Sequence, residues 1–284
     1  MKEIVVGIDF SESSVNAFHY AVKVANECNC NLKLIYVCKK RDKHKRLVKD
    51  DKGIELSANE SFKQLIDMNC QNLKGEVTFK MLHGKIYEEI SNQAKYTDAG
   101  MIITGAHGMS GFEELWVGNN AMKIIMHSEE PVLSVKKNYK FNKPLIEKIV
   151  IPVDSTQQTL QKVPFTLKIA KLFHAQVNVL SLFSSKTKDI EEKVEANTKI
   201  AHDMIVSSGV RYISEKKHCS NIARATIDYA TKRNADLISI MTEQEFSSNN
   251  VFLGTYAQQT INLSPMPILS FKSNIPYKSS IGLE

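Results

Sequence analysis

The chain begins with the stretch Glu3-Ile4-Val5-Val6-Gly7-Ile8-Asp9 and nearly repeats it as Lys148-Ile149-Val150-Ile151-Pro152-Val153-Asp154. Both stretches are runs of β-branched residues that end in an aspartate, and they lie 145 residues apart. Continuous apolar runs of this kind are typical of strands that helices cover on both faces of a parallel sheet. The two stretches therefore predict two copies of one α/β domain.

The repeat continues through both halves of the chain. The apolar pattern of residues 32–37 recurs at 177–182, again 145 residues later. Towards the end of each copy the spacing falls to 136 residues, because the segment 131–133 recurs at 267–269. The second copy has therefore lost nine residues, and we expect the loss in the loop after its second strand.

Strand-like and helix-like segments alternate within each copy. In the first copy, apolar runs predict strands at about 3–8, 31–37, 76–82, 100–104 and 131–135, with helical periodicity between them. This alternation predicts a doubly wound sheet of parallel strands flanked by helices. We predict tandem domains at 1–137 and 148–273, a linker at 138–147 and a tail at 274–284.

Composition argues against several classes of protein. No apolar run reaches the roughly 20 residues of a membrane span, and the first residues lack signal-peptide features. The net charge of +6 comes from 37 basic and 31 acidic residues, well short of the basic excess typical of nucleic-acid-binding domains. We therefore expect a cytoplasmic protein that binds neither membranes nor nucleic acid.

The five cysteines are an odd number, which argues against a disulfide framework and favours reduced thiols. Two of them form the sequence Cys28-Asn29-Cys30. A zinc site needs a second pair of ligands, and none follows at a suitable spacing. We therefore expect ordinary thiols there.

The strongest chemical motif follows the fourth predicted strand. Gly105, Gly108 and Gly118 stand there in the spacing Gly-x2-Gly-x9-Gly. Glycines let backbone N–H groups approach a phosphate, and the helix that opens after Gly118 favours an anion at its N-terminus. Asp9 ends the first strand at the same sheet edge, where a carboxylate accepts hydrogen bonds. The alternative is that these glycines form structural turns and a helix cap.

The segment 105–135, together with residues 4–13, resembles the universal stress protein family. That family has an aspartate after strand one and Gly-x2-Gly-x9-Gly-(Ser/Thr) after strand four, then an Ala-x-Lys helix and a Pro-Val-Leu-x-Val strand. Residues 121–123 read Ala-Met-Lys and residues 131–135 read Pro-Val-Leu-Ser-Val. The resemblance implies a five-stranded sheet of order 3-2-1-4-5 in each domain, and a homodimer or an intrachain pseudo-dimer.

The resemblance also implies an adenine nucleotide, ATP or a relative with or without Mg²⁺, at this edge. Asp9 and the backbone of Val37 would contact the adenine, and the glycines would line the ribose and phosphates. His107 lies inside the glycine loop and either contacts phosphate or supports the loop. The nucleotide-binding residues would then be Asp9, Val37, Gly105, His107, Gly108, Gly118, Asn119 and Asn120.

Both copies depart from the family pattern. In the first copy, Asn119 stands where the family has serine or threonine. In the second copy, Met241 and Gln244 replace the first two glycines, and their side chains would crowd a phosphate loop. We therefore expect the first domain to bind nucleotide and the second not to. The degenerate second site comprises Asp154, Leu182, Gly254 and Thr255.

No constellation of catalytic side chains is evident in the sequence. A nucleotide site without a catalytic lysine, an arginine finger or an aspartate pair predicts binding with at most weak ATP hydrolysis. We expect a stress-response module that responds to ATP and is read by an unidentified protein partner. The alternatives are a slow ATPase and a nucleotide-free scaffold.

Overall fold

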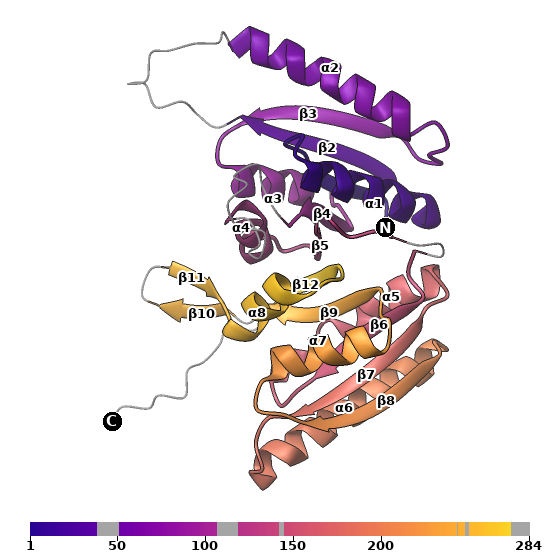
Figure 1. Cartoon of the computed structure of the whole chain (residues 1–284), viewed down its shortest axis with the longest axis vertical. Helices are drawn as coiled ribbons and strands as arrows, with labels where there is room; N and C mark the ends of the chain where they lie inside the picture. Colours follow the sequence, from indigo (N-terminus) through magenta and orange to yellow (C-terminus); the bar gives the residue numbers. More distant parts are fainter. Residues whose placement is uncertain (39–50, 107–118, 142–144, 243, 248–249, 274–284) are drawn as a thin grey trace. The chain divides into compact units, whose positions relative to one another are not determined.

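The computed structural model describes residues 1–38, 51–106, 119–141, 145–242, 244–247 and 250–273 (Figure 1). The chain divides into two compact units, Met1–Leu145 (unit 1) and Ile146–Glu284 (unit 2).

Unit 1 alternates strands and helices. Its sheet has the order β3-β2-β1-β4-β5, and the neighbouring strands are parallel. The predicted doubly wound fold and its strand order are therefore confirmed in this unit. The strands are β1 (Glu3–Gly7), β2 (Asn31–Cys38), β3 (Val77–His83), β4 (Met101–Gly105) and β5 (Val132–Val135), and the helices are α1 (Glu12–Cys28), α2 (Asp51–Asn69), α3 (Ile86–Tyr96) and α4 (Asn119–His127).

Unit 2 has the same topology, with the strand order β8-β7-β6-β9-β12. Its neighbouring strands are parallel as well, so the fold prediction is confirmed here too. The main strands are β6 (Lys148–Val153), β7 (Gln176–Phe183), β8 (Tyr212–His218), β9 (Leu237–Thr242) and β12 (Ile268–Lys272). The remaining elements are β10 (Gln244–Ser247), β11 (Asn250–Leu253), the 3₁₀-helix η1 (Gln157–Leu160), α5 (Val163–Leu172), α6 (Lys188–Ser208), α7 (Ile222–Lys232) and α8 (Thr255–Leu263).

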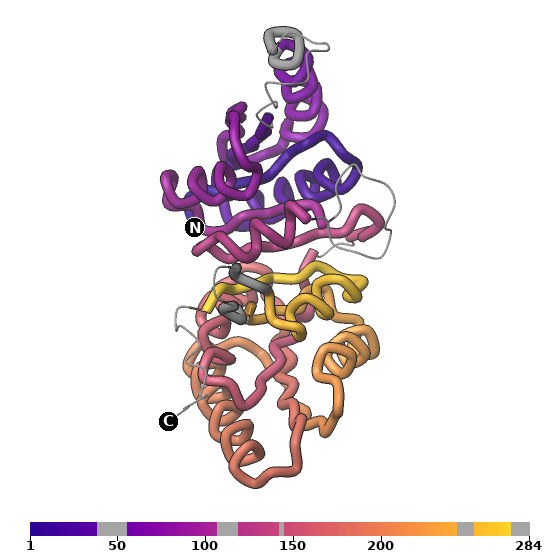
Figure 2. The backbone as a smooth tube through the Cα atoms, turned by 90° about the vertical axis from the view of Figure 1, so that its left-hand side faces the viewer, coloured from indigo at the N-terminus to yellow at the C-terminus, as the bar shows by residue number. Residues whose placement is uncertain are grey.

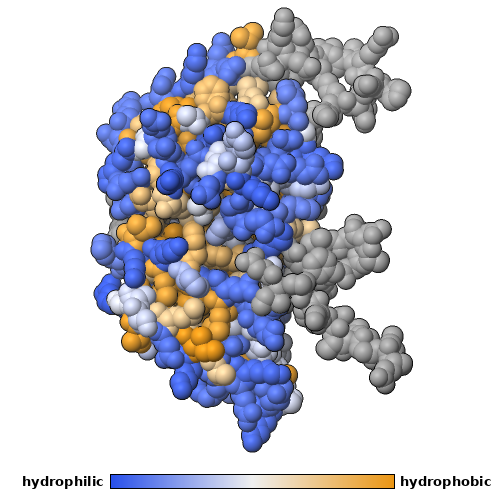
Figure 3. All heavy atoms as spheres, turned by 180° about the vertical axis from the view of Figure 1, so that it is seen from behind, coloured by the Kyte–Doolittle hydropathy of each residue, from blue (hydrophilic) through white to orange (hydrophobic). Residues whose placement is uncertain are grey.

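Helices cover both faces of each sheet (Figure 2). In unit 1, α3 packs on α4 while α1 packs on β1 and β4; in unit 2, α7 packs on α8 and α5 packs on α6. The middle strands are therefore sealed from water, and Ile4, Val5 and Val6 are 0% exposed. This explains why the decisive stretches are apolar at every position. Polar side chains cover most of the face seen in Figure 3, with scattered hydrophobic patches between them.

The repeat is visible in the backbone at the ends of four helices. Asn29 after α1 and His174 after α5 both adopt a left-handed conformation, with φ of 50° and 51°. Asp98 after α3 and Asn234 after α7 do the same, with φ of 50° and 51°. These pairs lie 145 and 136 residues apart, which are the two spacings found in the sequence. The duplication therefore extends to individual helix caps.

The nine missing residues of unit 2 come from more than one place. The connection from β7 to α6 is eight residues shorter than the connection from β2 to α2. The helix α6 is two residues longer than α2, and the turn after it is four residues shorter. One residue is added between β8 and α7. Most of the loss thus lies in the loop where we expected it, and the rest adjusts the helix that follows.

The left-handed cap at His174 yields a stability prediction. Its side chain is exposed, so substitutions there act mainly through the backbone. We expect His174→Gly to be more stable than His174→Val by about 2 kcal/mol, because a β-branched residue is strained at positive φ. Urea unfolding of the full chain measures the difference. Lys168→Val, at an exposed position inside α5, controls for valine itself, and equal midpoints for the two His174 variants would contradict the prediction.

Candidate functional site

The candidate site lies where three neighbouring strands of unit 1 end. β1 lies between β2 and β4, with Val6 opposite Leu34 on one side and Ile103 on the other. The ladder between β1 and β2 continues past the end of β1, because the Ile8 N–H donates to the Ile35 carbonyl at 2.9 Å. Parallel strands therefore bring Asp9, Val37 and Gly105 to one edge, where doubly wound proteins bind ligands.

Asp9 builds the turn that leads from β1 into α1. Its Oδ1 accepts hydrogen bonds from the backbone N–H of Ser11 at 3.0 Å and from the Ser11 hydroxyl at 2.5 Å. Ser11 in turn caps α1, since its Oγ accepts from the Ser14 N–H at 3.3 Å. No residue in the described part of the chain donates to the second carboxylate oxygen, Oδ2. One oxygen of Asp9 thus holds the turn, and the other remains for a ligand.

Unit 2 repeats the hydrogen bonds of the aspartate in this turn. Asp154 Oδ1 accepts from the Thr156 N–H at 2.8 Å and from the Thr156 hydroxyl at 2.6 Å. The Asp154 N–H donates to Thr159 Oγ1 at 3.2 Å, as the Asp9 N–H donates to Ser14 Oγ at 3.3 Å. The aspartate therefore has a structural role in both units. Its presence in unit 2 is explained without a ligand.

An aromatic cluster of Phe10, Tyr36, Phe62 and Phe79 lies beside the Asp9 turn. The Phe10 ring centroid is 4.9 Å from that of Phe62 and 5.7 Å from that of Tyr36, and Phe62 stacks on Phe79 at 4.7 Å. Phe10 has φ of 61°, a conformation that is strained for a bulky residue. Ring packing on both sides holds it there. Burial raises the pKa of Tyr36, and the nearby Cys38 and Asp9 add to the effect.

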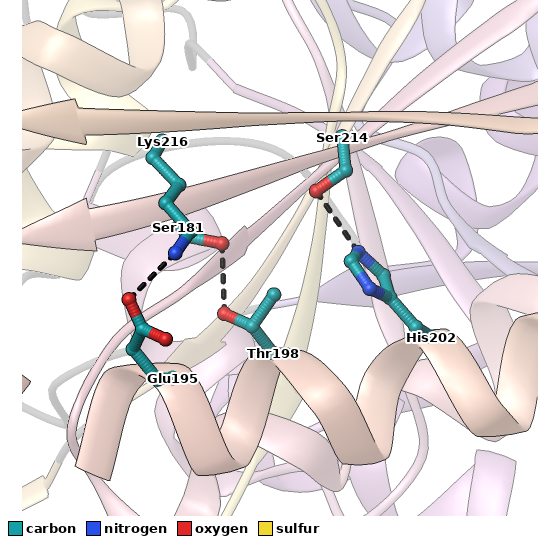
Figure 4. A network of polar contacts seen from close by, with 6 residues as sticks. All are labelled: Ser181, Glu195, Thr198, His202, Ser214 and Lys216. Carbon is teal, nitrogen blue, oxygen red and sulfur yellow. Dashed lines mark hydrogen bonds and ion pairs between the residues drawn. The ribbon is translucent and has the colours of Figure 1, made fainter. Parts of the chain in front are cut away.

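Unit 2 has polar side chains where unit 1 has this cluster (Figure 4). The strand positions of Tyr36 and Phe79 are taken by Ser181 and Ser214. Ser181 Oγ lies 2.7 Å from Thr198 Oγ1, and Ser214 Oγ lies 2.9 Å from His202 Nε2. Nearby, Lys216 pairs with Glu195 at 2.5 Å. These polar side chains satisfy one another's hydrogen-bonding and charge requirements. The corresponding surface of unit 2 is therefore polar, where unit 1 has the aromatic cluster.

Gly105 is required by packing as well as by any ligand. A Cβ at Gly105 would lie 2.6 Å from Ser13 Oγ and 2.7 Å and 2.8 Å from the Ser13 backbone carbon and oxygen. The end of β4 therefore rests directly on the first turn of α1. This supports the structural interpretation of the first glycine, which does not exclude the ligand role.

Met241 occupies the equivalent position in unit 2 and is 5% exposed. The helix after β6 also starts differently, since η1 (Gln157–Leu160) precedes α5, which begins at Val163. Pro164 lies in the first turn of α5 and has no N–H to continue an α-helix from the preceding residues. In unit 2, the replacement of glycine by Met241 on β9 is thus accompanied by a different start of the helix that follows β6.

A buried lysine in unit 2 escaped the sequence analysis. Lys162 is 2% exposed and stands at the position of Ala17 in unit 1. Its Nζ donates to the Thr159 carbonyl at 2.6 Å and to Thr159 Oγ1 at 3.2 Å. From α6, Asn197 Nδ2 donates to the Asp154 carbonyl at 2.8 Å. Unit 2 therefore uses the polar atoms of this edge to brace its own turn.

The remaining predicted residues of unit 1 follow β4. His107, Gly108 and Gly118 lie outside the described residues. Asn119 and Asn120 are the first two residues of α4, and both are exposed. Their placement at a helix N-terminus on the side of the edge is the one expected for an anion site.

In unit 2, Gly254 is the N-cap of α8 and Thr255 is its first residue. Leu182 is 1% exposed within β7. An antiparallel hairpin, β10–β11, connects β9 to α8, with Gln244 opposite Leu253. The sequence predicts that the side chains at 241 and 244 crowd a phosphate loop, but it does not predict the hairpin. A short apolar run at 251–253 is the signal that could have indicated the second strand.

No group of three or more His, Cys, Asp or Glu side chains in the described part of the chain is placed to hold a metal ion. None of the helices described there is long and apolar enough to cross a membrane.

The fold and the site define a doubly wound α/β protein whose candidate ligand edge is formed by β1, β2 and β4. The model of the universal stress protein family matches residues 1–136, which span nearly all of unit 1. By sequence, unit 1 is therefore similar to the universal stress protein family, and the match covers just under half of the chain.

Similar proteins agree with this assignment. A universal stress protein from Methanocaldococcus jannaschii is 27% identical over 150 residues, which cover 49% of this chain and 84% of that protein. The crystal structure of a universal stress protein from Archaeoglobus fulgidus has a TM-score of 0.74 at 16% identity, covering 95% of this chain and 98% of that one. The crystal structure of a putative universal stress protein from Pseudomonas aeruginosa has a TM-score of 0.66 at 17% sequence identity. That match covers 96% of this chain and 94% of the other. These two structural matches show the fold alone.

The contact at Gly105 yields a second prediction. Gly105→Ala should destabilise unit 1 by about 2–3 kcal/mol, because the added methyl meets backbone atoms that have little room to move. Gly84→Ala is the matched control, since its Cβ would meet only the flexible end of Glu89. Urea unfolding of the full-length variants measures both. Equal losses for the two variants would show that Gly105 is not fixed by packing.

Proposed function

We propose that unit 1 binds an adenine nucleotide, ATP or a relative, and that the protein is a nucleotide-responsive regulatory module of the cytoplasmic stress response. The observation that carries the proposal is the division of labour in Asp9. Its Oδ1 holds the turn through Ser11, while its Oδ2 stands at the strand edge with no donor among the described residues. A carboxylate oxygen so placed accepts a hydrogen bond from the amino group of adenine.

The rest of the edge is suited to the remainder of the nucleotide. Val37 lies at the end of β2, where its backbone is available to the base, and the aromatic cluster adds an apolar wall. In this proposal, the phosphates are bound by the start of α4 and by Gly105, His107, Gly108 and Gly118. The α4 N-terminus at Asn119 and Asn120 supplies free N–H groups and the positive end of the helix dipole. If Mg²⁺ accompanies the phosphates, this is where it would lie.

We infer that unit 2 does not bind nucleotide. Met241 stands in place of a glycine, the hairpin β10–β11 takes the place of the glycine loop, and Lys162 and Asn197 occupy the polar atoms around Asp154. The role of unit 2 would then be structural. A response to ATP further requires that two states of the protein bind ATP with different affinity, and a protein partner distinguishes those states.

Titration of the full chain with ATP tests the proposal, with Asp9→Asn as the variant. An asparagine Oδ1 still accepts from Ser11, so the turn survives, but an amide NH₂ replaces Oδ2 and turns a donor towards the adenine amino group. We expect ATP affinity to fall at least about tenfold, equivalent to about 1.4 kcal/mol. Isothermal titration calorimetry measures the change.

Asp154→Asn is the matched control, because it makes the same substitution in the same turn of unit 2. It should leave ATP affinity unchanged. Loss of affinity in Asp154→Asn with none in Asp9→Asn would place the site in unit 2 and overturn the proposal. Phosphate release measured on the same samples separates binding from slow hydrolysis: turnover that falls with Asp9→Asn would favour the ATPase alternative.

A further inference from the structure

Two cysteines meet at the end of α1, away from the nucleotide edge. Cys28 is the last residue of α1 and is half-buried, whereas Cys30 precedes β2 and is 1% exposed. Asn29 between them caps the helix in the left-handed conformation, with φ of 50° and ψ of 48°. The Cys30 N–H closes the cap by donating to the Ala25 carbonyl at 3.1 Å.

This backbone geometry brings the two cysteines within bonding range. The dihedral angles of the middle residue fix the distance between the Cα atoms on either side, and helical values of either hand give about 5.4 Å. Disulfides join Cα atoms about 4.4–6.8 Å apart. The two side chains also interact, since each thiol shifts the pKa of the other.

We propose that Cys28 and Cys30 are a redox-active pair that a peroxide oxidises to an intrachain disulfide. The sequence by itself favours ordinary thiols at this Cys-x-Cys segment, because a zinc site would need a second pair. A disulfide needs only the two sulfurs, and the helix cap holds them together. The inference is independent of nucleotide binding.

The reaction balances with a peroxide as the oxidant. One cysteine sulfur attacks a peroxide oxygen, which breaks the O–O bond, forms a sulfenic acid and releases water or an alcohol. The second sulfur then attacks the sulfenic sulfur, which forms the S–S bond and releases a second water. Two thiols lose two electrons and two protons in total, and one peroxide is reduced.

The interaction between the two thiols distinguishes this pair from Cys70 and Cys219. The interaction between the two thiols lowers the pKa of Cys30 and raises that of Cys28. Burial instead raises the pKa of Cys70 to about 11 and also raises that of Cys219. Since the thiolate is the nucleophile, we expect the pair to react before Cys70 and Cys219.

Packing around Cys30 determines which of the two cysteines moves when the disulfide forms. A Cβ at Gly75 would lie 2.2 Å from the Cys30 carbonyl oxygen, so the backbone there is tightly packed. The Asn31 N–H donates to the Lys2 carbonyl at 2.9 Å, and Asn31 Oδ1 accepts from the Glu76 N–H at 2.9 Å. These contacts fix the start of β2. Closing the disulfide therefore adjusts Cys28 at the helix end, which is also the more accessible sulfur.

Peptide mass spectrometry on the full chain tests the proposal. Trypsin cleavage after Lys23 and Lys33 leaves both cysteines in one peptide, residues 24–33. After treatment with hydrogen peroxide and alkylation of the remaining thiols, this peptide should be two hydrogen atoms lighter and carry no alkyl group. Its loss of free thiol should be at least about tenfold faster than that of Cys70, given the thiolate fractions. Reduction with dithiothreitol should restore both alkylation sites.

Three results would overturn the proposal: full alkylation of both cysteines, oxidation of either one to a sulfinic acid, or a disulfide between two chains. Cys28→Ser is the control variant, because it leaves the buried Cys30 and the helix cap in place. It should abolish the lighter peptide and leave the reactivity of Cys219 unchanged. ATP titration of the reduced and oxidised protein is a separate readout, so failure at the nucleotide site would leave the redox result intact.

Discussion

The hydrogen bonds of one aspartate set the geometry on which the rest of each unit depends. In unit 1, Asp9 Oδ1 binds both polar groups of Ser11, and in unit 2 Asp154 Oδ1 binds those of Thr156 in the same way. The turn they make reverses the chain from the first strand into a helix that covers the sheet. A charged acceptor makes these bonds stronger than neutral ones. The turn also places the aspartate at the edge formed by the carboxyl ends of the parallel strands.

Much of this fold could be predicted because its signals are local. Continuous apolar runs such as residues 4–8 encode strands buried on both faces, and the repeat with its two spacings reappears in the left-handed caps at Asn29 and His174. The candidate edge also followed from sequence, because an aspartate and a glycine after neighbouring parallel strands must meet. These inferences needed only periodicity and chain direction.

The features that escaped prediction depend on contacts between distant residues. Phe10 reads as an ordinary aromatic residue, but it adopts positive φ while its ring packs against Tyr36 and Phe62 from other elements. Lys162 reads as a surface charge, yet it stands at the inward-facing position of Ala17, and its Nζ donates to the Thr159 carbonyl. The contact between the Cys28 and Cys30 thiols requires the conformation of Asn29, which an Asn residue permits but does not dictate.

The comparison of the two units shows why a retained residue is weak evidence for a retained function. Asp154 keeps its place because the turn needs it, whereas the groups that would make its edge a ligand site have changed together. Gly105 corresponds to a buried methionine, Ala17 to a buried lysine, and Tyr36 and Phe79 to serines already bonded to Thr198 and His202. Each change fills space or consumes a polar atom that a ligand would otherwise use. An acid that holds a turn is thus retained in both units even where its surroundings differ, so function must be assigned from what surrounds the aspartate rather than from the aspartate itself.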